Sequence, residues 1–228
     1  MTLFAAEKFE RAIEHADEAL RLRPDFGAAQ YLKGQAVLYI YADESDRVAR
    51  KYPLRPGAEP AQRAAALGAR EREFAPLVAR MREAAARMEE FVNSQPNHPD
   101  APAWRELVGT LRVYGREMRP AASPSSVPGD AGDADEGETA TTKARMSKNP
   151  EPEYSKEARE DCISGVVRLR AVLASDGTVK HILPVKRLGY GLTQRAIEAA
   201  RGIKFTPARK GGRPVSQFVL LEYNFACY

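Results

Sequence analysis

Apolar residues in the first half of the chain recur with the period of an α-helix. From Phe9 to Leu22 they are spaced three and four residues apart, which predicts one amphipathic helix. Pro24 ends it, because proline cannot continue the helical hydrogen-bond ladder. The same period returns over Phe26–Tyr41, over Pro60–Val92 and around Trp104–Tyr114. We therefore predict an α-helical domain over residues 1–120.

The first two predicted helices resemble a tetratricopeptide repeat (TPR). Small residues Ala12, Ala16 and Ala19 lie in one helix, Pro24 follows it, and Gly34 lies where the next helix could approach closely. The resemblance covers about one and a half repeats and begins in mid-repeat, so we expect a further segment upstream. It implies a groove for a partner. A small helical domain whose apolar stripes are only core remains an equal alternative.

A change of composition separates this domain from the rest of the chain. Residues 121–148 include the run SPSSVPGDAGDADEGETATT, made of Pro, Gly, Ser, Thr and acidic residues. Such a segment buries too little apolar surface to offset the entropy lost on ordering. We predict a flexible acidic linker over residues 121–148, followed by a second domain over residues 149–228.

The second domain shows the two-residue alternation of β-strands. Asp176-Gly177 separates two alternating runs, which predicts a hairpin because glycine tolerates positive φ. Thr193 is the expected N-cap of a short helix. The expected elements are a helix, two strands, a helix and a strand, at Ser155–Glu160, Gly165–Leu173, Thr178–Val185, Thr193–Ala200 and Val215–Phe225. This order predicts an α+β domain.

Charge and cysteine content narrow the possible partners. The net charge is +4, and residues 148–228 hold 14 Lys and Arg against 8 Asp and Glu, or +6. No nucleic-acid-binding motif accompanies this excess, so we expect no nucleic-acid partner. Cys162 and Cys227 are too few for a disulfide scaffold and lack metal-ligand spacing. Two buried thiols, or one bridge in a periplasmic domain, both remain open.

The sequence offers no catalytic constellation. The three histidines, His15, His98 and His181, lie in no nucleophile, base or metal motif. The stretch Leu188–Leu192 contains Gly-x-Gly without a third glycine, which favours a tight turn over a phosphate loop. We predict a protein that is not an enzyme, with no cofactor and no metal site.

Short motifs in the second domain follow one another at characteristic spacings. They are Pro152-x-Tyr154, Gly165-x-Val167, Asp176-Gly177-x-Val179, Phe205-x-Pro207-Ala208, Gly212-x-Pro214-Val215 and Tyr223-x-Phe225. In order and spacing, this region resembles the C-terminal domain of the TonB energy-transducer family. The resemblance implies an α+β fold with a three-stranded antiparallel sheet and two helices.

The resemblance also implies a function. Domains of this family bind a short peptide, the TonB box of an outer-membrane receptor, as a strand added to the edge of the last strand, and so support energy-coupled transport. The partner-binding residues carried over by position are Glu151, Pro152, Glu153, Tyr154, Val215, Gln217, Val219, Leu221 and Tyr223. The family usually has proline after the tyrosine, where this chain has Ser155. For Phe205 and Phe225, core packing is favoured over partner contact.

The resemblance implies the periplasm of a Gram-negative cell envelope. No apolar run reaches the roughly 18 to 20 residues that span a bilayer, and no signal peptide is visible. Inner-membrane motor proteins would be reached through a missing anchor or another subunit. The alternative is a periplasmic scaffold or assembly protein that forms a homodimer through the C-terminal sheet edge and binds partners through the TPR-like helices.

Overall fold

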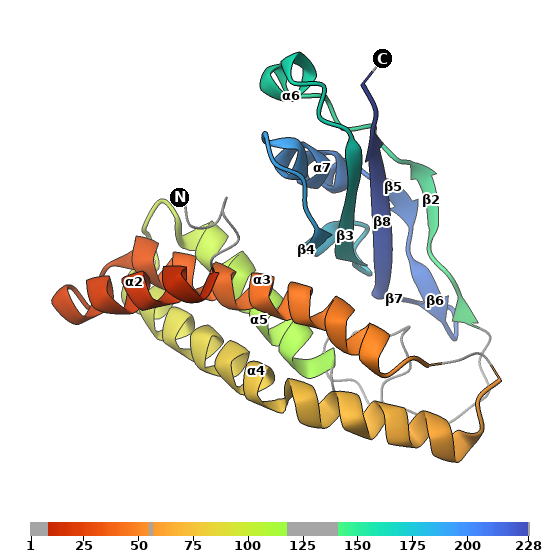
Figure 1. The fold of residues 1–228 in the computed structure, drawn as a ribbon, viewed down its shortest axis with the longest axis horizontal. Helices are drawn as coiled ribbons and strands as arrows, with labels where there is room; N and C mark the ends of the chain where they lie inside the picture. The colour runs from red at the N-terminus through yellow and green to blue at the C-terminus, as the bar shows by residue number, and fades with distance from the viewer. Residues whose placement is uncertain (1–8, 55–56, 118–140, 228) are drawn as a thin grey trace. The chain divides into compact units, whose positions relative to one another are not determined.

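The computed structural model describes residues 9–54, 57–117 and 141–227 (Figure 1). The chain divides into two compact units, Met1–Ala121 and Ala122–Tyr228.

In the first unit, helices that follow one another along the chain pack antiparallel to each other (Figure 1). Its helices are α2 (Phe9–Leu22), α3 (Gly27–Lys51), α4 (Pro60–Ser94) and α5 (Ala101–Glu117). Each packs on the next along the chain, and α3 also packs on α5. The helical prediction is confirmed, although α3 extends well past Tyr41 and α4 continues through Pro76.

Large buried side chains and small residues together form the core of this unit. The ring of Tyr41 lies 5.8 Å from those of both Phe74 and Tyr114, which joins α3 to α4 and α5. A Cβ at Gly34 would lie 2.9 Å from Leu107 Cδ2, so the close approach expected at Gly34 is confirmed. A residue larger than glycine at this position would therefore displace the Leu107 side chain of α5.

The helix lengths differ from those of the predicted repeat. A tetratricopeptide unit holds two helices and a turn within 34 residues, whereas α4 alone has 35 residues. Helix α4 packs on both α3 and α5. The repeat is therefore not shown by the fold.

The second unit contains a three-stranded antiparallel sheet in the order β4-β3-β8. Its strands are β3 (Gly165–Leu173), β4 (Val179–Lys186) and β8 (Gln217–Phe225), and its helices are α6 (Lys156–Glu160) and α7 (Leu192–Arg201). Helix α7 packs on β3 and β4, and its small apolar residues join the strands in one core. The predicted fold class is confirmed.

Local chemistry explains where these elements begin. Ser155 caps α6, since its Oγ accepts a hydrogen bond from Ala158 N at 3.2 Å. The predicted N-cap at Thr193 is wrong, because α7 begins at Leu192 after Gly191, whose φ is 74°. Thr193 Oγ1 instead donates to the carbonyl oxygen of Leu188 at 2.7 Å and closes the preceding turn.

The region before α6 is more structured than predicted. Strands β1 (Thr141–Thr142) and β2 (Arg145–Lys148) occupy the end of the range expected to be linker. We call residues Thr141–Lys148 the β-arm. The linker prediction is therefore corrected from residue 141 onward, since backbone pairing orders this polar segment without any apolar core. Residues 121–140 lie outside the described part of the chain.

The β-arm pairs antiparallel with the segment that follows α7. Strand β1 pairs with β6 (Ala208–Lys210), β2 pairs with β5 (Lys204–Thr206), and β6 also pairs with β7 (Arg213–Val215). The single last strand predicted from Val215 to Phe225 is thus two strands. Ser216 separates them, and its Oγ accepts a hydrogen bond from Ser175 N at 3.1 Å.

Candidate functional site

Strand β8 lies at one edge of the main sheet. It pairs with β3 over nine consecutive residue pairs, from Gln217 opposite Leu173 to Phe225 opposite Gly165. In the sheet order β4-β3-β8, no ladder joins its other side to any strand of the described residues. Alternate residues of an edge strand direct their N–H and C=O groups away from the sheet. The geometry therefore offers a row of backbone donors and acceptors to an added strand.

The side chains of β8 divide between two faces. Leu221, Tyr223 and Phe225 are buried in the core, while Leu220 is 58% exposed on the opposite face. Among the predicted partner-binding residues, Leu221 and Tyr223 therefore have side chains that pack inward, away from the surface. Burial also raises the pKa of Tyr223 to about 12.

Val215 and Gln217, two of the predicted partner-binding residues, lie in different strands. Gln217 begins β8, and its side-chain Oε1 accepts a hydrogen bond from Ala144 N at 2.9 Å. Val215 lies in β7, where it pairs with Ala208. Val215 therefore belongs to a different ladder from Gln217, Val219, Leu221 and Tyr223.

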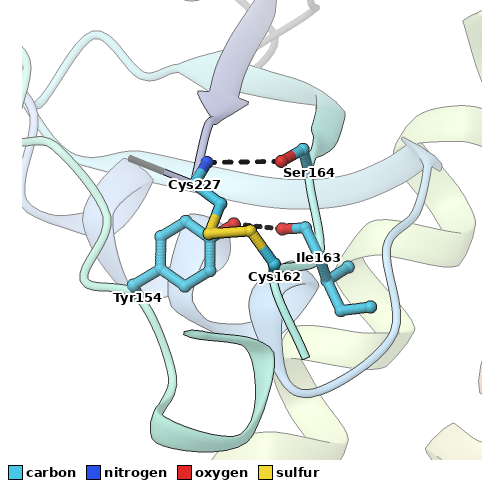
Figure 2. The surroundings of a disulfide bond; sticks show 5 residues. All are labelled: Tyr154, Cys162, Ile163, Ser164 and Cys227. Carbon is cyan, nitrogen blue, oxygen red and sulfur yellow. Dashed lines mark hydrogen bonds between the residues drawn. A yellow bond between two sulfur atoms is a disulfide. The ribbon is translucent and has the colours of Figure 1, made fainter. Parts of the chain in front are cut away.

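The second predicted contact segment, Glu151–Tyr154, lies beside the far end of β8. The Tyr154 ring meets the Phe225 ring edge to face at 5.6 Å between centroids. Tyr154 also donates its hydroxyl hydrogen bond to the carbonyl oxygen of Ile163 (Figure 2). Phe225 and the half-buried Phe205 pack in the core as expected. The structure thus brings Tyr154 to β8, while Glu151 and Glu153 remain exposed.

A disulfide joins the end of β8 to the turn after α6. Cys162 and Cys227 are bonded with their Cα atoms 5.3 Å apart, and Cys227 N donates to Ser164 Oγ at 3.2 Å (Figure 2). This decides the cysteine question that the sequence left open. The bridge closes a separation of 65 residues and ties the chain end beyond β8 to the segment next to Tyr154.

The opposite edge of the sheet is poorly suited to strand addition. Strand β4 pairs with β3 through two register shifts, and Pro184 lacks an N–H that could be donated. His181 lies at this irregular strand with φ 52°. Bulges and proline are the devices that discourage pairing at sheet edges. Strand β8 is therefore the more regular of the two edges.

Residues 150–227 match the family described as Gram-negative bacterial TonB protein C-terminal. This part of the chain is a TonB C-terminal domain. TonB C-terminal domains are non-catalytic. The helical region that precedes the domain has no family assignment. No curated protein matches the chain.

The β4-β3-β8 sheet and helices α6 and α7 lie within the TonB C-terminal domain, but the β-arm precedes residue 150. The sequence did not indicate the β-arm, because Ala144 and Met146 are its only apolar residues, too few to predict a strand. The pairing of the β-arm with Lys204–Lys210 joins segments that are far apart in the sequence, and no local pattern indicates it.

In the part of the chain that the structure describes, no three His, Cys, Asp or Glu residues gather as metal ligands would. Among the same residues, no helix combines the length and apolar character needed to cross a bilayer.

A polar groove lies between α2, α3 and α4 of the helical unit. Its volume is about 240 Å³, and ion pairs cross it from Lys33 to Asp17 at 2.6 Å and from Arg80 to Glu10 at 2.8 Å. The Arg80 guanidinium lowers the pKa of Glu10 by hydrogen bonding to it. These pairs join α2 to its neighbours across the groove.

Proposed function

We propose that the TonB C-terminal domain binds the TonB box of an outer-membrane receptor as a strand added to β8. Binding of this kind would support energy-coupled transport across the outer membrane. The observation that carries the proposal is that β8 lies at the more regular edge of the sheet, where no strand of the described residues pairs with its outer side. Main-chain hydrogen bonds would give affinity, and side chains next to the edge would give specificity.

The chemistry along β8 supports this mode of binding. The exposed Leu220 offers an apolar contact on one face of an added strand. On the same face, Glu222 is paired with Arg168 at 2.5 Å, which leaves charged groups of both signs near the edge. An added peptide with alternating apolar and polar residues fits this surface, because side chains of a strand alternate between faces.

We infer a periplasmic location for this domain. The Cys162–Cys227 bridge supports the inference, since disulfides persist in oxidising compartments such as the bacterial periplasm. The family match supports it independently. Outer-membrane receptors present their peptides in that compartment.

Calorimetry with a synthetic TonB-box peptide tests the binding proposal. The variants are Val219→Pro and Leu220→Pro, because neighbouring residues direct their N–H groups to opposite sides of a strand. One substitution removes a donor to β3 and destabilises the sheet, while the other removes a donor to the peptide. We expect one variant to stay folded by circular dichroism and to lose binding.

Hydrogen exchange in the unsubstituted protein provides a second measurement. Addition of the peptide should slow exchange at alternate amides between Gln217 and Tyr223, while a scrambled peptide should not. If both proline variants fold and bind as well as the original protein, the β8 mechanism is wrong. The same holds if the peptide leaves exchange in β8 unchanged.

The assembly alternative uses the same edge. Two copies could pair β8 with β8, while the helical unit, if it acts as the predicted tetratricopeptide-like module, binds another partner. Light scattering separates the two functions. A monomer that binds the peptide supports receptor capture, whereas a stable dimer that ignores the peptide supports assembly.

A further inference from the structure

Basic residues collect on the strands formed by the β-arm and its pairing partners. The β-arm pairs with both β5 and β6, which are separated only by Pro207, and β7 extends the second ladder (Figure 1). We call these two segments, Thr141–Lys148 and Lys204–Val215, the basic ribbon. All of its charged side chains are positive and exposed, and they are Lys143, Arg145, Lys148, Lys204, Arg209, Lys210 and Arg213.

The positive charge of the second unit is concentrated in the basic ribbon. Residues 141–227 hold 16 Lys and Arg against 8 Asp and Glu. Seven of the 16 belong to the ribbon, and neither of its two segments contains an Asp or Glu. The rest of residues 141–227 is nearly neutral, with nine basic and eight acidic residues. The ribbon therefore accounts for almost all of the charge excess.

Two pairs of like charges lie directly opposite each other across the ladders of the ribbon. Lys148 lies opposite Lys204 in the β2–β5 ladder, and Lys210 lies opposite Arg213 in the β6–β7 ladder. Side chains that are directly opposite share one face of a ladder, and like charges in such a pair are destabilising. The arrangement costs stability in the isolated domain, and an anionic partner would remove this cost.

The cations of the β2–β5 ladder share the face that points away from the core. Phe205 packs against the core, so the neighbouring Lys204 and Thr206 point to the opposite face. Arg145 lies opposite Thr206, and Lys148 lies opposite Lys204. Because opposed residues share a face, all three cations of this ladder point outward together.

The basic side chains of the ribbon are not held in place by their neighbours. Among the residues that the structure describes, Arg209 alone of the seven makes a side-chain hydrogen bond, to the carbonyl oxygen of Gly212 at 2.8 Å, and none forms an ion pair. A site for one small anion needs cations that further contacts fix in position. The run Lys204–Lys210 also spans up to about 20 Å when extended, far more than one anion covers. The ribbon therefore fits an extended anionic surface better than a small ligand.

We propose that the basic ribbon binds the anionic headgroups of a phospholipid bilayer and so holds the domain at a membrane surface. A bilayer presents many mobile anionic groups in one plane, which suits long cationic side chains that no neighbour restrains. Clusters of about four to eight Lys and Arg are attracted to anionic lipid in this way. This inference goes beyond peptide binding by β8 and does not depend on it.

Co-sedimentation of the full chain with lipid vesicles tests the proposal. The anionic vesicles contain phosphatidylcholine and phosphatidylglycerol in equal parts, and vesicles of phosphatidylcholine alone are the neutral reference. The ribbon variant removes both like-charged pairs and is Lys148→Gln/Lys204→Gln/Lys210→Gln/Arg213→Gln. The control variant removes the same amount of charge at exposed positions outside the ribbon and is Lys156→Gln/Arg159→Gln/Lys186→Gln/Arg195→Gln.

We expect the unsubstituted protein to bind the anionic vesicles and not the neutral ones, and to be released by high salt, because salt screens exposed charges. Each Lys or Arg near an anionic bilayer strengthens binding about fivefold, so the ribbon variant should bind at least about 100-fold more weakly. The control variant should stay within about 5-fold of the unsubstituted protein, since its substitutions lie away from the lipid.

Urea unfolding separates lost binding from lost folding. Because the ribbon variant lacks the two like-charged pairs, it should be at least as stable as the unsubstituted protein. A ribbon variant that folds and still binds the anionic vesicles as tightly as the unsubstituted protein overturns the proposal. Equal losses of binding in the ribbon and control variants also overturn it, since they would assign the attraction to net charge.

An acidic protein segment is the alternative occupant, and polyglutamate serves as its probe. Binding of polyglutamate without binding of the anionic vesicles would assign the ribbon to an acidic partner and would overturn the membrane proposal. Residues 130–138 contain five carboxylates and stay in the chain throughout, so the vesicles must bind in competition with them. The TonB-box peptide is not used, so a failure here leaves the proposed function of β8 in place.

Discussion

The ring of Tyr154 meets the ring of Phe225 edge to face, with 5.6 Å between their centroids. Tyr154 belongs to the segment before α6, and Phe225 is the last residue of β8. The contact therefore joins two segments, 71 residues apart in sequence, that both contain predicted partner-binding residues. Because the Tyr154 ring packs against the end of β8, Tyr154 has a structural role whether or not it also contacts a partner.

We predict that Tyr154→Ala destabilises the domain by about 2 to 3 kcal/mol, because a half-buried aromatic ring is lost. Tyr154→Phe keeps the ring and loses only the hydrogen bond to Ile163 O, which should cost about 1 kcal/mol. Urea unfolding of both variants measures the difference. Equal losses would show that the hydroxyl, and not the ring packing, supports this corner.

The disulfide gives a second prediction about the same corner. Cys162→Ser/Cys227→Ser should lower the free energy of unfolding by about 2 to 4 kcal/mol, since the bridge restricts the unfolded chain across a long loop. The measurement is urea unfolding with and without a thiol reductant. Reductant should destabilise the original protein and leave the double variant unchanged. An original protein that is indifferent to reductant would contradict the bridge.

The sequence predicted the main sheet because its strands carry their own signals. The alternation in Gly165–Leu173 and the Asp176-Gly177 turn are local, and the structure keeps both. The inward face of β8 has a local signal of the same kind, since Leu221, Tyr223 and Phe225 alternate with polar residues. The candidate edge followed from the family resemblance and not from the alternation, which does not reveal which strand is outermost.

The features that were missed depend on contacts between distant residues. The polar β-arm becomes strand only because Lys204–Lys210 supplies its backbone partners. The break at Ser216 depends on its hydrogen bond with Ser175, far away in sequence. The bridge required Cys162 and Cys227 to meet, which only the antiparallel pairing of β3 with β8 achieves. Local patterns contain none of this information.

The hairpin between β3 and β4 predicts a pH dependence of stability. The Lys180 ammonium, with the Thr178 hydroxyl, lowers the pKa of Asp176 from 3.8 to about 2. A lowered pKa in the folded state stabilises the fold above pH 3.8, and this contribution disappears as the pH falls through about 2. Asp176→Asn should therefore be destabilising at neutral pH and equal to the original protein near pH 2.

The size of this effect is limited by solvent. The Asp176 side chain is 51% exposed, so we expect no more than about 1 kcal/mol at neutral pH. Thermal unfolding of both proteins at a series of pH values measures the difference. The control is Glu151→Gln, an exposed carboxylate in the same domain. A difference for Asp176→Asn that does not shrink with falling pH would exclude the ionised carboxylate as its cause.

The last prediction concerns two glycines of the helical unit. A Cβ at Gly27 would lie 2.7 Å from Phe91 Cε1 and 2.8 Å from Trp104 Cζ2, and these rings already pack edge to face at 4.8 Å. A Cβ at Gly68 would meet only the end of the Arg72 side chain at 3.6 Å. Two packed rings cannot move apart as easily as a flexible arginine.

We therefore expect Gly27→Ala to destabilise the helical unit by about 1 to 3 kcal/mol, the usual cost of overpacking a core. Gly68→Ala, in the interior of α4, should stabilise it by about 0.5 to 1 kcal/mol through higher helix propensity. Chemical denaturation followed by circular dichroism at a helix wavelength measures both. Opposite signs support the close approach of α3 to α4 and α5 at Gly27. Stabilisation by both substitutions would mean that the rings of Phe91 and Trp104 leave room for a methyl group.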